Sequence, residues 1–169
     1  MTSYSLPAIR RPPMLNVDIL GFGVLRLEHL VLEFNGTLAV DGKLLPGVKR
    51  RIAKLSQGLR VHVLTADTFG SARAELRGVH CELSLLEGGR QNHAKARYVR
   101  RLGEVNTVCV GNGRNDRLML RISVLGIAVI QAEGAAPASI QEADIVVNGV
   151  RDALDLLLNP LRLVAGLRT

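Results

Sequence analysis

Short apolar segments alternate with segments of helical periodicity along most of the chain, and this alternation predicts the fold class. Strands are expected at residues 30–34, 60–64, 80–83, 107–110, 126–129 and 145–147, and helices at 48–57, 70–76, 92–102, 116–122 and beyond 150, where Pro160 divides the last one. Strands that alternate with crossover helices form a mostly parallel sheet with helices on both faces. The pattern therefore predicts a three-layer α/β/α, Rossmann-like domain.

The chain before the first of these strands has a different pattern. Residues 1–13 contain prolines and arginines and are expected to form an N-terminal arm, so that a single domain covers residues 14–169. Residues 15–19 and 24–27 alternate around a Gly-Phe-Gly turn, which predicts a β-hairpin that leads into the first strand of the sheet.

Composition supports the α/β class and narrows the range of partners. Of the 169 residues, 47% are hydrophobic and only 3% are aromatic, so aliphatic side chains must form the core, as in strands buried on both faces. The net charge of +7 comes from separate basic groups at residues 10–11, 49–54 and 90–101. Because no aromatic residues interleave with these charges, a solvated basic surface is favoured over nucleic-acid binding.

Cysteine use and hydropathy favour a cytoplasmic protein. Cys81 and Cys109 lie in apolar, strand-like contexts without the spacing of a metal site, which predicts two buried thiols in a reducing compartment. No apolar stretch reaches the roughly 18 residues that span a bilayer, and no signal-peptide pattern follows the arginines near the N-terminus. A membrane location and a metal-transport role are therefore not expected.

Polar or glycine-rich residues follow three of the predicted strands. Residues 33–37 read Glu-Phe-Asn-Gly-Thr, residues 65–68 read Thr-Ala-Asp-Thr, and residues 111–116 read Gly-Asn-Gly-Arg-Asn-Asp. Lys95 lies on the helix before the strand at 107–110. Since ligands of open α/β sheets bind at the carboxyl ends of the strands, these segments predict one polar site.

The order and spacing of these segments resemble the four motifs of the haloacid dehalogenase (HAD) superfamily, in particular its small soluble members that are similar to the catalytic core of P-type ATPases. The resemblance runs from about residue 15 to the C-terminus. It implies a Mg²⁺-dependent phosphohydrolase, a phosphatase or weak ATPase, that acts on a phosphorylated substrate.

The resemblance also implies a role for each motif residue. Glu33 stands where the family has a nucleophilic aspartate that also contacts Mg²⁺, and Asn35 stands where many phosphatases have an aspartate as general acid and base. An amide cannot transfer a proton near neutral pH, although the backbone carbonyl of Asn35 is implied as a metal ligand. P-type ATPases have threonine at this position and turn over slowly.

The other motifs supply the remaining predicted site residues. Thr65 matches a hydroxyl that binds phosphoryl oxygens, with Ala66 and Gly36 beside it, and Lys95 matches an ammonium that offsets phosphate charge. Asp116 is retained in the fourth motif, where Asn112 replaces a leading aspartate. The predicted sets are Glu33, Asn35, Thr65 and Lys95 for catalysis, Thr65, Ala66, Gly36 and Lys95 for phosphate, and Glu33, Asn35, Asp116 and Asn112 for metal.

The two functional hypotheses differ in whether Glu33 can still act as the nucleophile. Its extra methylene is expected to misplace the carboxylate, and a misplacement of about 1 Å can lower a rate on the order of a hundredfold. The chain is therefore expected to be a phosphohydrolase of reduced activity or an inactive HAD-like binding or regulatory protein. The sequence does not separate natural loss of activity from an engineered substitution.

Several of these residues have a simpler alternative. Lys95 could be an ordinary solvated lysine with Arg90 in its place, and residues 65–68 could cap a helix through their hydroxyls and Asp67. Structural roles are expected for the four histidines, His29, His62, His80 and His93.

Chain length leaves no room for a cap domain. A short flap hairpin is predicted at Asp41-Gly42, and residues 37–65 and 65–95 hold only the elements already named. The site should therefore be open. The resemblance implies that capless members act on large substrates or associate, and the N-terminal hairpin could offer an edge for a homo-oligomer.

Overall fold

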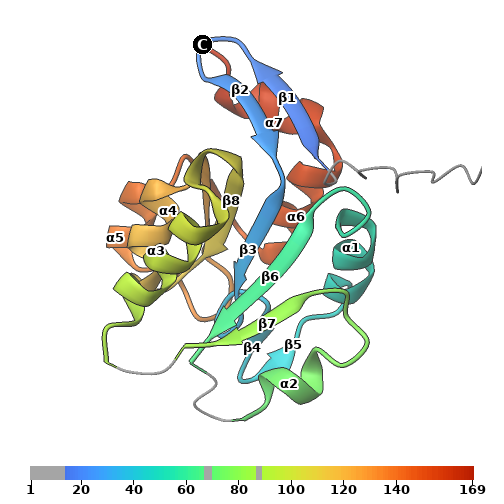
Figure 1. Ribbon diagram of the computed structural model, residues 1–169, viewed down its shortest axis with the longest axis vertical. Helices are drawn as coiled ribbons and strands as arrows, with labels where there is room; N and C mark the ends of the chain where they lie inside the picture. The colour runs from blue at the N-terminus through green and yellow to red at the C-terminus, as the bar shows by residue number, and fades with distance from the viewer. Residues whose placement is uncertain (1–13, 67–69, 87–88) are drawn as a thin grey trace, which may run out of the picture.

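A six-stranded parallel sheet forms the centre of the molecule, in the strand order β10-β9-β8-β3-β6-β7 (Figure 1). The computed structural model describes residues 14–66, 70–86 and 89–169, so the predictions for the arm at 1–13, for Asp67 and for Thr68 lie outside it. The strands are β3 (His29–Glu33), β6 (Arg60–Thr65), β7 (Glu82–Leu85), β8 (Thr107–Gly111), β9 (Leu125–Val129) and β10 (Ile145–Val147). The predicted parallel sheet is confirmed.

Helices cover both faces of this sheet. They are α1 (Val48–Leu55), α2 (Ala72–Glu75), α3 (Gln91–Leu102), α4 (Arg117–Ile122), α5 (Pro137–Glu142), α6 (Val150–Leu158) and α7 (Pro160–Leu167), with 3₁₀ turns η1 (Glu104–Asn106) and η2 (Arg114–Asp116). Figure 1 shows α1 and α6 on one face and α3, α4 and α5 on the other. Successive residues of β3 face the two sides, because Leu30 and Leu32 belong to the core under α1 and α6 while Val31 belongs to the core under α3 and α4. The predicted three layers are confirmed.

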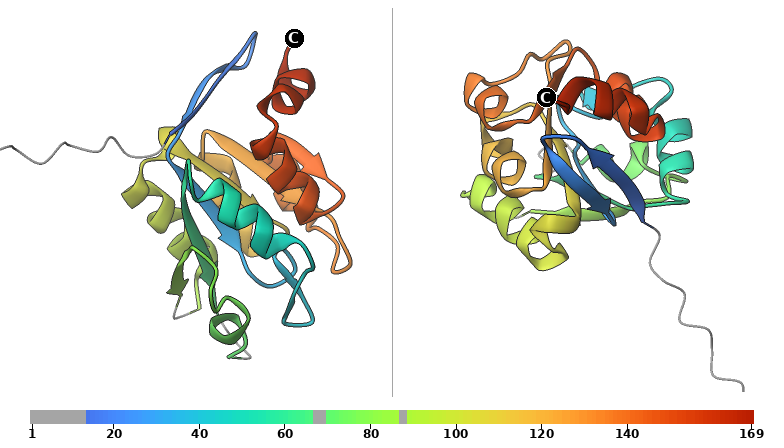
Figure 2. Two further views of the ribbon diagram at one scale, coloured as in Figure 1. Left: turned by 90° about the vertical axis from the view of Figure 1, so that its right-hand side faces the viewer. Right: turned by 90° about the horizontal axis from the view of Figure 1, so that it is seen from above.

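The predicted N-terminal hairpin is also present. Strand β1 (Leu15–Ile19) pairs with β2 (Gly23–Leu27), which Glu28 alone separates from β3. The hairpin extends beyond the sheet beside α7 (Figure 2), and its inner side chains are buried in the same core as Leu163 of α7. At its tip Leu20 is 77% exposed and Val24 is 56% exposed. The homo-oligomer that this edge could support stays a prediction.

The flap predicted at Asp41-Gly42 joins β4 (Ala39–Val40) to β5 (Lys43–Leu44). Both turn residues have positive φ, 51° at Asp41 and 72° at Gly42, as a tight two-residue hairpin turn requires. The chain from Thr37 to Thr65 contains this flap, α1 and β6, so no cap domain is inserted there.

Three elements differ from expectation. Strand β7 begins at Glu82 rather than at residue 80, and α2 is only four residues long. Helix α5 was not expected, because the Gly-Ala-Ala-Pro sequence at its start is typical of a loop. A tertiary contact holds this start, since the Ala136 N–H donates to the Asn112 carbonyl.

The two cysteines differ in burial. Cys109 is buried as predicted, and burial raises the pKa of its thiol to about 12. Cys81 precedes β7 and is only half-buried, which corrects the expectation that it belongs to a buried strand. Both thiols are free. Among the described residues, no helix is long and apolar enough to cross a bilayer.

Candidate active site

The predicted site residues meet where β3, β6 and β8 end. These strands are adjacent and parallel, with Glu33 opposite Leu64 in β6, so the segments that follow them lie at one edge of the sheet. Glu33, Thr65 and Gly111 end the three strands.

Lys95 extends from α3 into this edge and joins two carboxylates. Its Nζ donates to Glu33 Oε2 and, at 2.6 Å, to Asp116 Oδ1. The three side chains are at most 7% exposed, whereas Arg90 is exposed. The structure thus brings Lys95, and not Arg90, to the predicted site.

One ammonium faces two carboxylates in this cluster, and the pKa values follow from that imbalance. Burial and the charge of Asp116 raise the pKa of Glu33 to about 7, against the opposing effect of Lys95. Burial acts to lower the pKa of Lys95, but Asp116 and Glu33 together raise it above its ordinary value. Lys95 therefore stays charged, while Glu33 readily takes up a proton near neutral pH.

Both carboxylate oxygens of Asp116 are occupied. Oδ1 accepts from Lys95, and Oδ2 accepts from the backbone N–H groups of Asn112 at 3.0 Å and Gly113 at 2.8 Å. A Cβ at Gly111 would lie 2.6 Å from the Asp116 carboxyl carbon, so glycine allows this close approach. The arrangement makes Asp116 a support for Lys95.

The first two motifs touch through Asn35 and Thr65. The Asn35 Nδ2 donates to Thr65 Oγ1 at 3.2 Å, and Thr65 is fully buried. Ala66 follows directly and is half-buried. The Asn35 side chain thus orients the Thr65 hydroxyl, which is the group predicted to bind phosphoryl oxygens.

The first and fourth motifs touch through Asn112. Its Oδ1 accepts from Thr37 Oγ1 at 3.2 Å, and its Nδ2 donates to the Gly134 carbonyl at 3.0 Å. Gly36 has a φ of 76°, and a Cβ there would lie 2.4 Å from Asn112 Nδ2. Glycine is therefore required at position 36 by both conformation and space.

Gln131 was not predicted, although it contacts the same loop. Its Nε2 donates to the carbonyls of Gly36 at 2.8 Å and Thr37 at 2.6 Å, and its Oε1 accepts from the Val150 N–H at 2.9 Å. Its own φ is 39°, which is unusual for a residue other than glycine. That strained backbone leaves no signal in the sequence, and the partners lie far away along the chain.

No protein-family model matches the chain. Comparison with individual proteins, however, shows the family to which it belongs. It is 44% identical over 81 residues to the uncharacterized protein MJ0073 of Methanocaldococcus jannaschii, a match that covers 46% of this chain and 87% of that protein. The chain belongs to the MJ0073 family. The uncharacterized protein MJ0072 of the same organism is 44% identical over 39 residues, which are 23% of this chain and 89% of that protein.

Solved structures show that this member of the MJ0073 family has the HAD fold. A 3-deoxy-D-manno-octulosonate 8-phosphate phosphatase from Moraxella catarrhalis, in complex with magnesium, phosphate and a sugar acid, is 14% identical with a TM-score of 0.63, over 82% of this chain and 90% of its own. The cobalt-bound phosphatase YrbI from Haemophilus influenzae is 14% identical with a TM-score of 0.65, over 85% of this chain and 94% of its own. The catalytic domain of the CPx-ATPase CopB-B is 21% identical with a TM-score of 0.58, over 69% of this chain and 46% of its own.

In the MJ0073-family chain, a cavity of about 510 Å³ opens beside the site. It is lined by Asn35, by the flap residues Asp41, Gly42 and Lys43, by Ser71 and by Glu133. The flap is held in place because the Asp41 N–H donates to Glu133 Oε1 at 3.2 Å. The mouth of the site is thus polar and charged.

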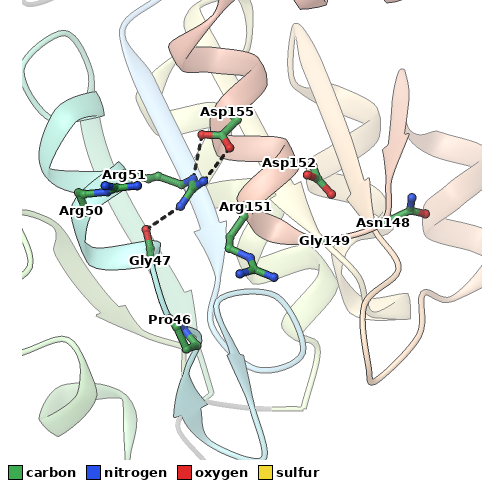
Figure 3. A pocket seen from close by; sticks show the side chains of 9 residues that line it. All are labelled: Pro46, Gly47, Arg50, Arg51, Asn148, Gly149, Arg151, Asp152 and Asp155. Carbon is green, nitrogen blue, oxygen red and sulfur yellow. Dashed lines mark hydrogen bonds and ion pairs between the residues drawn. The ribbon is translucent and has the colours of Figure 1, made fainter.

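A second cavity, of about 660 Å³, lies between α1 and α6 and contains none of the predicted site residues (Figure 3). Arg51 donates through Nε and Nη2 to the two carboxylate oxygens of Asp155, each at 2.8 Å, and through Nη1 to the Gly47 carbonyl at 3.2 Å. This bidentate ion pair ties the two helices together, so its role is structural.

The donor chemistry of the site fits Mg²⁺, which prefers hard oxygen ligands and commonly uses one or two carboxylates. The oxygens of the predicted metal set are the Glu33 and Asp116 carboxylates, the Asn112 amide and the Asn35 backbone carbonyl. In the described part of the chain, no group of three or more His, Cys, Asp or Glu side chains could hold a metal. A magnesium site here would therefore carry little negative charge.

Proposed function

We propose that the chain is a Mg²⁺-dependent phosphohydrolase of the HAD type, with turnover reduced by Glu33. The observation that carries the proposal is the buried Lys95 ammonium, held between Glu33 and Asp116 at the end of β3. Phosphoryl transfer depends mainly on positioning and on neutralising oxygens that already carry charge, and a fixed ammonium does both. Two of the similar solved structures are phosphatases, which supports the same class.

Each residue has a role in the proposed reaction. The carboxylate at position 33 attacks phosphorus, the bond to the leaving oxygen breaks, and water then hydrolyses the acyl phosphate. Lys95 and the Thr65 hydroxyl hold the phosphoryl oxygens, with Gly36 and Ala66 beside them. Asn35 cannot give a proton to the leaving oxygen, so esters with acidic leaving groups should be the better substrates.

The metal belongs to the same proposal. Glu33, Asp116, Asn112 and the Asn35 carbonyl would hold Mg²⁺, and Asp116 would also hold Lys95. When bound, the ion would add positive charge beside the phosphoryl oxygens.

The local structure explains why turnover should be reduced. The Glu33 carboxylate is bound to Lys95, and its pKa of about 7 leaves a large fraction protonated near neutral pH. Its extra methylene also displaces the nucleophilic oxygen by about 1.5 Å, roughly one carbon–carbon bond. Both effects lower the population of a carboxylate able to attack.

A binding or regulatory role is the second candidate, and one observation favours it. In the described residues, no buried side-chain nitrogen or oxygen lacks a hydrogen-bond partner, so the site is satisfied without a substrate. A protein of this kind would bind phosphate without turnover.

Initial rates of p-nitrophenyl phosphate and ATP hydrolysis with Mg²⁺ separate these candidates. We expect Glu33→Asp to exceed the unchanged chain by at least about a hundredfold on the aryl ester. The double variant Glu33→Asp/Lys95→Ala should lose that gain, whereas Glu33→Asp with the exposed Lys54→Ala should keep it. If Glu33→Asp is folded and binds Mg²⁺ but is inert, the phosphohydrolase proposal fails.

Four further predictions accompany the proposal. We propose one domain over residues 14–169, a phosphorylated substrate and a homo-oligomer that covers the open mouth. The free thiols of Cys81 and Cys109 support a cytoplasmic location.

A further inference from the structure

Seven arginines lie on α3, the adjoining η2 and α4, and the residue just before α3; six of them are exposed and Arg117 is half-buried. These elements lie on the side of the sheet opposite α1 and α6 (Figure 1). Helix α3 contains no acidic residue and only one lysine, Lys95, which is buried in the site. The arginines of this α3 face are Arg90, Arg97, Arg100, Arg101, Arg114, Arg117 and Arg121.

Folding brings together two arginine groups that are separate in sequence. Asn115 Nδ2 donates to Gln91 Oε1 at 2.8 Å, which joins η2 to the start of α3. The arginines at 114–121 thus lie beside those at 90–101. The sequence shows these only as separate basic groups.

Most of this charge is not neutralised within the chain. Arg100 pairs with Glu104 at 3.2 Å, and Arg121 approaches Glu142 at 3.9 Å. Among residues 14–66, 70–86 and 89–169, no carboxylate lies within 4.0 Å of the guanidinium groups of Arg97, Arg101, Arg114 or Arg117. With respect to the described carboxylates, these four charges are unpaired.

The α3 face carries two hollows lined by arginines. One, of about 470 Å³, is lined by Leu86, Ala94, Arg97, Arg100 and Arg101. The other, of about 410 Å³, is lined by Gly89, Gln91, Asn92, Arg114, Asn115 and Arg117. They lie along α3, whose 12 residues span about 18 Å. Duplex DNA presents roughly one phosphate charge per 1.7 Å of its axis, so a helix of this length faces several phosphates.

We propose that the α3 face binds the sugar-phosphate backbone of double-stranded nucleic acid. Arginine rather than lysine supplies the exposed charge, and its planar fork matches phosphate oxygens. The Arg101 guanidinium lies 5.3 Å from the centre of the Tyr98 ring, which limits its freedom. Tyr98 itself is only 7% exposed, so the face has no aromatic platform for unstacked bases. The absence of interleaved aromatics argues against single strands and does not affect backbone binding.

The inference is independent of the proposed phosphohydrolase activity. It needs only the distribution of charge over α3, η2 and α4. Asn115, which lines one of the hollows, belongs to the same 3₁₀ turn, η2, as the site residue Asp116.

The test measures binding of fluorescent 20-base-pair DNA and RNA duplexes by anisotropy at several salt concentrations. The α3-face variant combines Arg97→Gln, Arg101→Gln, Arg114→Gln and Arg117→Gln. The matched control combines Arg50→Gln, Arg151→Gln, Arg162→Gln and Arg168→Gln on the other side of the molecule. Both variants lower the net charge from +7 by four.

We expect the unchanged chain to bind duplex with strong salt dependence. The α3-face variant should bind at least about tenfold more weakly at 100 mM salt, with the slope of log K against log salt reduced by about 3 to 4. The control should change affinity by less than about threefold. Circular dichroism verifies folding, and the pair Arg97→Gln/Arg114→Gln replaces the fourfold variant if that one unfolds.

Three results would overturn the proposal. The first is no binding of either duplex at low salt. The second is equal weakening in the two fourfold variants, which would reflect net charge alone. The third is equally tight binding of polyglutamate of matched charge, which would indicate an acidic protein partner instead.

Discussion

At the scale of single residues, the site is built from side chains that hold one another. Lys95 joins Glu33 to Asp116, Asn35 donates to Thr65, and Asn112 accepts from Thr37. The asparagines at 35 and 112 take the places of acidic residues in the resembled family, and here each is engaged as a neutral hydrogen-bonding group. Among the described residues, the buried acidic side chains of the site are Glu33 and Asp116, around one lysine.

Gly36 tests the packing of the loop against Asn112. Gly36→Ala places a methyl group on a backbone with φ of 76° and within 2.4 Å of Asn112 Nδ2. We expect a loss of stability of about 2–4 kcal/mol, from left-handed strain and overpacking together. Thermal and urea unfolding measure it.

Gly134→Ala is the matched control for this prediction. Its φ is 73°, but nothing lies within 4 Å of the added Cβ, so only the strain of about 1–2 kcal/mol should remain. Equal destabilisation by the two substitutions would show that the contact with Asn112 does not constrain the loop.

At the scale of elements, the Gln131 side chain connects the site loop to two other segments. Gln131 follows β9 closely and joins the carbonyls of Gly36 and Thr37 to the Val150 N–H at the start of α6. Three segments are thus fixed relative to one another by one amide. Gln131 binds the loop after β3 through its backbone carbonyls, and Asn112 binds it through the Thr37 hydroxyl.

Removing this amide should loosen the loop. We expect Gln131→Ala to cost about 2–3 kcal/mol of stability, at roughly 1 kcal/mol for each lost hydrogen bond. Hydrogen exchange at the amides of residues 36–39 should accelerate. Gln57→Ala, at an exposed position, should stay within about 0.5 kcal/mol and leave that exchange unchanged. If hydrogen exchange in Gln131→Ala is unchanged, the Gln131 side chain does not hold the loop.

At the scale of the whole molecule, two cores stabilise the sheet, and a polar chain crosses one of them. His29 Nδ1 and His62 Nε2 share a hydrogen bond of 3.0 Å, and His62 Nδ1 lies 3.0 Å from Tyr98 Oη. Both histidines are buried, so the expected structural role is confirmed for them, while His80 and His93 are exposed. These hydrogen bonds link β3, β6 and α3.

These buried, hydrogen-bonded histidines make the stability of the protein depend on pH. Burial lowers the pKa of His29 and His62 below the ordinary 6.5, so the unfolded chain binds more protons just below that pH and stability falls as pH falls. The fall amounts to at most about 1.4 kcal/mol per pH unit for each histidine, and it ends below the folded pKa. Glu33 acts in the opposite sense between its ordinary 4.5 and about 7, because its pKa is raised.

The contribution of the histidines can be measured as the difference in stability between two proteins. The stability of the unchanged chain minus that of His62→Gln should shrink as pH is lowered from 7.5 to 5, since Glu33 contributes equally to both. Gln57→Ala, which changes an exposed group that does not titrate, should give a difference that does not vary with pH. A constant difference for His62→Gln would contradict a buried, neutral histidine pair.

The sequence predicts the elements whose pattern is local and misses those that depend on distant contacts. The apolar strands, the Asp41-Gly42 turn and the order of Glu33, Thr65, Lys95 and Asp116 all leave signals in periodicity and spacing. Helix α5 and Gln131 do not, because a short helix after a loop-like sequence and a left-handed glutamine are fixed only by partners elsewhere in the fold. The clustering of arginines on the α3 face likewise requires the packing of α3 against η2.

The most direct test of the central claim is the mass of the protein after reaction. Glu33→Asp and the unchanged chain are incubated with p-nitrophenyl phosphate and Mg²⁺, quenched in acid, and analysed by intact and peptide mass spectrometry. We expect one added phosphoryl group at position 33 in Glu33→Asp, little or none in the unchanged chain, and none when Lys95→Ala is added. Hydrolysis by Glu33→Asp without phosphorylation at position 33, or no phosphorylation and no hydrolysis in the folded variant, would contradict that claim.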